Sequence, residues 1–168
     1  MKRIIMLGVV AIVLIEAITA QALTTEEIAV VAKVSNDYLS TLPAKEYHVM
    51  ASEVLERINS GKKDFILIDV RMPRDKTYDQ GHLPGAISVG FKDIAKPENL
   101  AKLPKGKDII VYCATGHEEN KVLTVLRMLG YNAYAMKWGY MSWKTAMPSG
   151  LTLKAIEGSI SNSYPIEK

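Results

Sequence analysis

Cys113, the only cysteine in the chain, lies between a strand-like and a helix-like segment. Residues 109–112 are apolar and β-branched, as in a buried strand, and residues 121–129 carry the apolar stripe of an amphipathic helix. Backbone N–H groups of such a loop, with the positive end of the helix, stabilise anions and favour a thiolate. The position predicts a nucleophilic thiol, and the alternative is a small buried apolar residue.

The loop itself supplies further candidate site residues, which are Ala114, Thr115, Gly116, His117, Glu118 and Glu119. We expect the N–H groups of Thr115, Gly116 and His117 to bind the thiolate and to outweigh the two carboxylates. The pKa of Cys113 should then lie below the unperturbed ~8.5. His117 either assists proton transfer or is an exposed loop residue.

The order of the elements indicates an α/β fold. Helices alternating with short apolar strands predict a parallel sheet flanked by helices. We expect helices over residues 24–42 (capped by Thr24 or Thr25), 52–58 (capped by Ser52), 92–103 (short, interrupted by Pro97), 121–129 and 139–146, and strands over residues 47–50, 65–70, 86–89, 109–112 and 133–136.

Three polar or aromatic clusters follow strands of this predicted sheet. Asp69 to Arg71 lie at the end of the second strand, Cys113 at the end of the fourth, and residues 137–140 at the end of the fifth. Because ligands gather at the carboxyl ends of parallel strands, these clusters should meet at one site.

The first residues read as an export signal. Lys2 and Arg3 precede an apolar run over residues 4–15, and Ala20-Gln21-Ala22 fits a cleavage site. We therefore expect a periplasmic or secreted protein that begins at Leu23 and has no stable membrane insertion after cleavage. The alternative is an uncleaved anchor. One thiol in an oxidising compartment forms no internal disulfide, which favours chemistry at Cys113.

The composition argues against nucleic-acid binding and against a metal site. The formal net charge is +3, with charges of both signs interspersed, so nothing favours nucleic-acid binding. Three scattered histidines and one cysteine do not have metal-ligand spacing, and we expect no metal and no cofactor.

Residues 47–148 resemble the rhodanese-like domains. The resemblance rests on Asp69-Val70-Arg71, on the segment from Tyr78 through Gly81-His82-Leu83-Pro84-Gly85-Ala86, on Tyr112-Cys113 with Gly116, and on Trp138-Gly139 with Trp143-Lys144. It implies a single rhodanese-like domain over residues 44–150. Residues 1–22 form the signal, 23–43 an extra N-terminal helix and 151–168 a tail.

The resemblance also implies an activity. A rhodanese-like sulfurtransferase takes a sulfane sulfur on the cysteine as a persulfide and gives it to a nucleophilic acceptor. Cys113 would be that catalytic residue. Its partners would be small sulfur donors and thiol acceptors, or a protein sulfur acceptor.

The loop departs from the family pattern at two positions. The usual arginines are replaced by Ala114 and Glu118, so a small dianion such as thiosulfate meets two carboxylates and no arginine. Polysulfide or a persulfide is therefore the expected donor.

Four residues outside the loop have assigned roles. Asp69 and His82 are expected to hold the structure of the motif. Arg71 either contacts substrate or is structural, paired with an acid such as Asp75 or Asp79. Trp138 forms either an apolar wall of the pocket or part of the core edge.

Two alternatives belong to other classes. A cysteine phosphatase needs an arginine where Glu119 stands, which excludes this chemistry. A non-catalytic rhodanese-like sulfur carrier, sensor or protein-binding module remains open, because a fold does not determine function.

Overall fold

The computed structural model describes residues 22–72, 78–79 and 81–144. Residues 1–21 of the expected signal segment, Asp75 and the tail lie outside these residues. The elements in chain order are α1 (Thr25–Ser40), β1 (His48–Val49), α2 (Ala51–Asn59), β2 (Phe65–Asp69), β3 (Ile87–Ser88), α3 (Pro97–Leu100), β4 (Asp108–Tyr112), α4 (Glu118–Met128), β5 (Ala133–Met136) and the 3₁₀ turn η2 (Gly139–Ser142).

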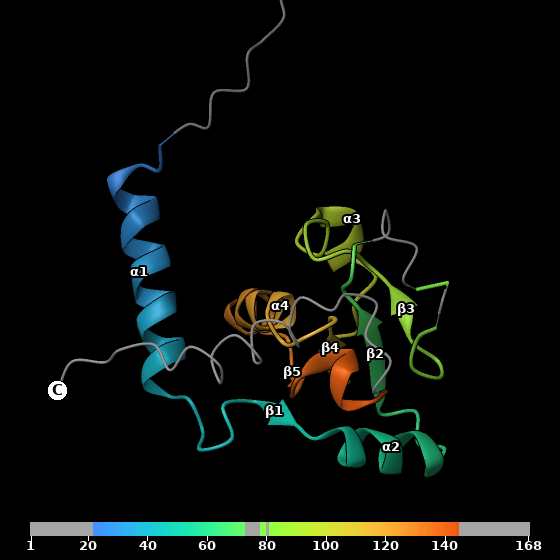
Figure 1. The fold of residues 1–168 in the computed structure, drawn as a ribbon. Coiled ribbons are helices and arrows are strands. Elements are labelled where there is room, and N and C mark those ends of the chain that lie inside the picture. Colours follow the sequence, from blue (N-terminus) through green and yellow to red (C-terminus); the bar gives the residue numbers. More distant parts are fainter. Residues whose placement is uncertain (1–21, 73–77, 80, 145–168) are drawn as a thin grey trace, which may run out of the picture.

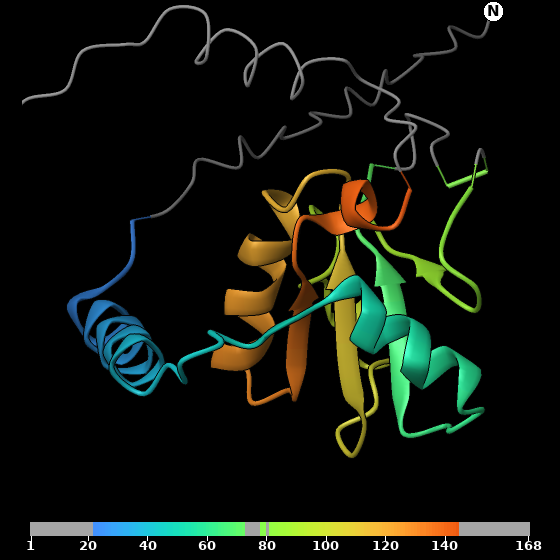
Figure 2. The ribbon, with the colours of Figure 1, turned by 60° about the horizontal axis from the view of Figure 1, so that its bottom comes forward.

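The five strands form one parallel sheet in the order β1-β5-β4-β2-β3. Asp69 at the end of β2 pairs with Tyr112 at the end of β4. The predicted α/β class and parallel sheet are therefore confirmed, and the carboxyl ends of the central strands lie at one edge, as Figure 2 shows.

Alternate residues of β4 face opposite sides of the sheet. Ile109, Val111 and Cys113 belong to the apolar cluster that includes α4. Ile110 and Tyr112 belong to a second cluster, which includes Val54 of α2. A strand buried on both faces explains why the segment is apolar without interruption, and its period places the Cys113 side chain on the side of α4.

Helix α1 lies beside the domain and has no buried residue (Figure 1). Thr24 caps it, as predicted, and receives a hydrogen bond from the Glu27 N–H. Tyr38 stacks on Tyr47 with ring centroids 6.3 Å apart. Among the described residues, no helix combines the length and apolar character that crossing a membrane requires.

Several predicted helix boundaries were wrong. α2 begins at Ala51 with Met50 as its N-cap, so Ser52 is not the cap. Pro97 begins α3 instead of interrupting a helix, because proline is favoured in the first turn. α4 begins at Glu118, three residues earlier than its apolar stripe indicated, and the helix predicted over residues 139–146 is the short turn η2 in its described part.

Candidate functional site

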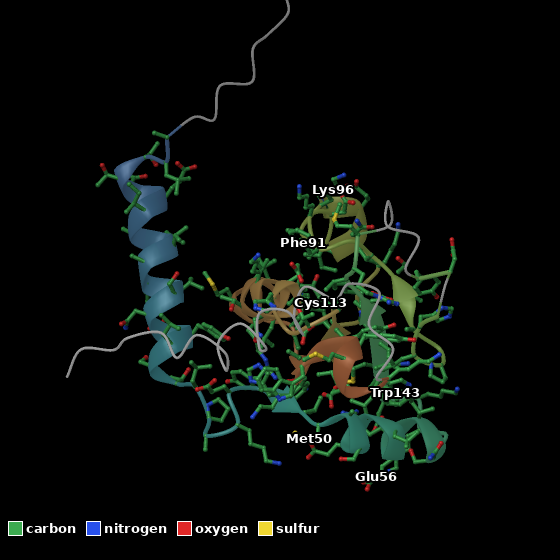
Figure 3. All side chains as sticks on the ribbon, in the orientation of Figure 1. Met50, Glu56, Phe91, Lys96, Cys113 and Trp143 are labelled. Carbon is green, nitrogen blue, oxygen red and sulfur yellow. The ribbon has the colours of Figure 1, made fainter. Side chains whose placement is uncertain are left out.

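The site is centred on Cys113, directly after the central strand β4. The residue is 1% exposed and lies deep in the domain beside α4 (Figure 3). The Gly116 N–H donates to Sγ at 3.2 Å, and the Thr115 N–H also stabilises the thiolate form. These two N–H groups belong to the predicted loop, which ends where His117 caps α4.

Glu119 occupies the other side of the thiol. It was a predicted site residue of the loop, but it belongs to α4 and is fully buried. Its Oε2 accepts a hydrogen bond from the Cys113 N–H, and the Gly139 N–H stabilises the same carboxylate. The Cys113 side chain also lowers the pKa of this carboxyl group, while Oε1 has no partner among the described residues.

The pKa values of the pair contradict the sequence-based expectation. Burial, and then the charge of Glu119, raises the pKa of Cys113 to about 12. Burial also raises the pKa of Glu119 to about 7, with Glu118 adding to the effect. The expectation failed because it placed the thiol in solvent-screened surroundings, whereas desolvation disfavours a thiolate and outweighs the two N–H groups.

Gly139 makes this arrangement sterically possible. Its φ is +55°, and an added Cβ would lie 2.5 Å from the Cys113 carbonyl oxygen and 2.9 Å from Glu119 Oε2. The turn η2 is anchored to the loop because Tyr140 donates its N–H to the same carbonyl at 2.7 Å. The close approach of η2 therefore covers the carboxyl group of Glu119.

Arg71 was expected either to contact substrate or to be structural, and its contacts fit the structural role. Its guanidinium pairs with Asp69, at 2.9 Å to each carboxylate oxygen from Nε, and donates to the Gly81 carbonyl at 2.7 Å. It is buried and packs over the ring of Tyr140 at 4.5 Å. Its partner is thus Asp69 and not Asp79, and the pair joins β2 to the loop that begins at Gly81.

His82 also contributes to the structure of its loop. Its ring stacks on Tyr78 with centroids 3.8 Å apart, and Nδ1 lies 2.9 Å from the Tyr78 carbonyl oxygen. The Tyr78 hydroxyl in turn donates to the Ala86 carbonyl at 2.6 Å. These contacts give His82 a structural role in its segment.

Trp138 lies in the open part of the site. It is 56% exposed, so it is a pocket wall and not part of the core edge. The pocket has a volume of about 210 Å³ and is lined by His48, Thr115, Gly116, His117, Asn120, Lys137 and Trp138. It lies against the outer side of the loop that holds Cys113.

A hydrogen-bonded chain fixes this side of the loop. His48 Nε2 lies 2.8 Å from Asn120 Oδ1, and Asn120 Nδ2 donates to the Gly116 carbonyl at 2.5 Å. His117 Nδ1 lies 2.8 Å from Thr115 Oγ1, so its ring contacts the loop and not the thiol. The sequence did not indicate the roles of His48 and Asn120, because their contact spans 72 positions.

Within the described ranges, no three His, Cys, Asp or Glu side chains converge as metal ligands. The chemistry that the arrangement offers is therefore that of one thiol beside one carboxyl group, with two N–H groups facing the sulfur.

Comparisons with known proteins agree with the geometry. The rhodanese-like domain pattern matches residues 50–146. The chain is 30% identical over 111 residues to the Mycobacterium tuberculosis protein named probable adenylyltransferase/sulfurtransferase MoeZ, a match that covers 66% of this chain and 28% of that protein. It is 28% identical over 108 residues to a sulfurtransferase of Allochromatium vinosum, covering 64% of this chain and 94% of that one.

Among solved structures, a rhodanese-like domain protein from Staphylococcus aureus aligns with a TM-score of 0.52 and 25% identity. The alignment covers 58% of this chain and 90% of the staphylococcal one. The chain thus spans about 28% of the length of the mycobacterial relative. Its matches cover 94% of the Allochromatium vinosum protein and 90% of the staphylococcal one.

Proposed function

The chain belongs to the rhodanese-like domain family, and from this premise we propose that it is a sulfurtransferase that carries sulfane sulfur on Cys113. The observation that carries the proposal is the placement of the chain's one thiol at the end of β4, with the Thr115 and Gly116 N–H groups facing its sulfur. Such groups stabilise the persulfide anion that the transfer requires.

The transfer would take two steps. The Cys113 thiolate attacks the outer sulfur of a donor R–S–SH, a new S–S bond forms on Sγ, and the S–S bond of the donor breaks to release R–S⁻. An acceptor thiolate then attacks the outer sulfur of the Cys113 persulfide and leaves with it, which regenerates the Cys113 thiolate. No metal, cofactor or net oxidant is needed.

The donor is proposed to be polysulfide or a persulfide, and not thiosulfate. Thiosulfate is a dianion, and it would approach a thiol that lies beside Glu119, on the helix that also carries Glu118. Arg71 cannot compensate, since Asp69 and the Gly81 carbonyl occupy its guanidinium. A persulfide brings less negative charge to the same sulfur.

We propose a periplasmic or secreted location. The protein to test is therefore the exported form without its first 22 residues. The protein is incubated separately with polysulfide, thiosulfate and mercaptopyruvate, and intact-protein mass spectrometry measures sulfur added to the chain. We expect addition from polysulfide at the lowest concentration and none in Cys113→Ser. Equal addition to the serine variant would overturn the proposal.

A second candidate function is a sulfur carrier or sensor that lacks turnover. The deep burial of Cys113 and its raised pKa favour this alternative, since both slow a resting thiol. The same experiment separates the two. A carrier would take up one sulfur and keep it when a small thiol acceptor is added, whereas a transferase would release it and accept another.

A further inference from the structure

The proposed sulfur transfer leaves one part of the site without a role, the buried carboxyl group of Glu119. A fully buried acid normally has its oxygens paired, but here Oε1 has no partner among the described residues. The other oxygen is held in place by the Cys113 N–H, and the Gly139 N–H also stabilises the group. The geometry therefore keeps a carboxyl group at a fixed position beside the thiol.

We propose that Glu119 is the internal base of Cys113: its carboxylate takes the thiol proton before sulfur uptake and returns it to the departing thiolate. The inference rests on the proposed function and adds a catalytic residue to it. Before reaction the pair is S–H with COO⁻. Proton transfer gives S⁻ with COOH, and the net charge of the pair does not change. The buried site therefore never contains two negative charges at once.

The rest of the cycle balances in the same way. The thiolate attacks R–S–SH, the Cys113 persulfide forms, and R–S⁻ leaves. The proton on Glu119 then converts R–S⁻ to R–SH, which restores the carboxylate. This route explains how a thiol with a high pKa can react near neutral pH, because the pair and not the thiol alone loses the first proton.

Among the described residues, the groups that act on the pair come from α4, from η2 and from the segment around Cys113. Glu118 of α4 raises the pKa of Glu119, and the Gly139 N–H of η2 and the Cys113 N–H lower it. The Thr115 N–H lowers the pKa of Cys113, and the Gly116 N–H donates to its sulfur. The pKa of Glu119 of about 7 makes the carboxylate available as a base at neutral pH.

The pH dependence of alkylation by iodoacetamide tests the proposal, because this neutral reagent needs no sulfur donor. We expect the rate of the natural protein to rise through about pH 7. In Glu119→Gln, the rise should move to higher pH, with a loss on the order of 10²-fold at neutral pH. Glu56→Gln, at an exposed glutamate of α2 outside the site, is the matched control and should keep the natural midpoint.

A structural effect of the substitution would lower the rate at every pH without moving the midpoint, and this result would overturn the proposal. A faster reaction of Glu119→Gln at neutral pH would also overturn it, since the carboxylate would then only repel the thiolate. Neither result depends on sulfur uptake by the natural protein. That uptake is measured separately and tests the proposed function.

A second measurement does not require the glutamine variant to fold. The Glu119 carboxyl carbon is titrated by NMR in the natural protein and in Cys113→Ala. The Cys113 side chain lowers the pKa of Glu119, so its removal should raise the carboxyl midpoint in the alanine variant. An unchanged midpoint would show that the two groups share no proton, and the proposal would fail.

Discussion

A buried carboxyl group beside a buried thiol ties the reactivity of Cys113 to the stability of the fold. Glu119 has a pKa of about 7 in the folded protein, above its ordinary value of 4.5, because burial disfavours its charge. The unfolded chain therefore loses this proton at lower pH than the folded one. The contribution of the group to stability is complete below about pH 4.5 and is lost as the pH rises through about 7.

Glu119→Gln should remove this pH dependence. Thermal unfolding of the natural protein and of the variant is measured from mildly acidic to mildly alkaline pH. We expect the melting temperature of the variant, relative to the natural protein, to increase with pH across this range. A constant difference would mean that Glu119 does not change its charge between these conditions.

Charge at the loop entrance should determine the choice of donor. Glu118 occupies the position of a usual arginine in the family, and Glu118→Arg should raise the specificity constant for thiosulfate on the order of tenfold. The gain should shrink as salt is added and should exceed any gain in alkylation rate. Glu56→Arg is the matched charge reversal, since this exposed residue projects from α2 away from Cys113 (Figure 3). Equal gains in both variants would contradict a local effect.

At the scale of elements, the end of β2 is joined to the next loop by one buried ion pair. Arg71 and Asp69 have side chains 5% and 0% exposed. Asp69→Asn would leave the guanidinium charge buried, and we expect a loss of about 3–5 kcal/mol in the free energy of unfolding by urea. Asp93→Asn breaks the exposed pair with Lys96 and should cost less than about 1 kcal/mol. Similar losses would refute the structural role of Arg71.

The approach of η2 to the loop depends on Gly139. Gly139→Ala should lower both sulfur uptake and stability, because the new Cβ would meet the Cys113 carbonyl and the Glu119 carboxyl group. Gly130→Ala is the control: its φ of +79° is similarly strained, but no atom lies within 4 Å of the added Cβ. We expect the control to cost about 1 kcal/mol and to keep its activity. Calorimetry and mass spectrometry measure the two effects, and an equally active Gly139→Ala would contradict the packing argument.

The helix boundaries show which part of the site the sequence could reveal. Glu119 lies on the same stripe of α4 as Val122, Leu123 and Leu126, all of them buried. The spacing of these four residues was a signal for burial, but we traced the apolar stripe only from residue 121 and treated the charge of the acid as partly screened. A charged residue at an apolar position is informative because it requires partners, and those partners come from η2 and from the end of β4.

At the scale of the whole molecule, the class of fold and the convergence of strand ends could be predicted, because both follow from the order and period of apolar segments. The depth of Cys113 could not be predicted. It depends on how closely α4 and η2 pack against the end of β4. The contacts of η2, such as that between Tyr140 and Cys113, join positions that are distant in the sequence. This depth decides the direction of the pKa shift of Cys113.

The complete transfer through Cys113 tests the account most directly. The natural protein is loaded with sulfur from polysulfide, freed of excess donor, and mixed with a small thiol. Mass spectrometry follows both the protein and the thiol. We predict that one sulfur per chain appears on Cys113 and then on the thiol as a persulfide, and that Cys113→Ser neither loads nor transfers. A serine variant that transfers at the natural rate would contradict the account.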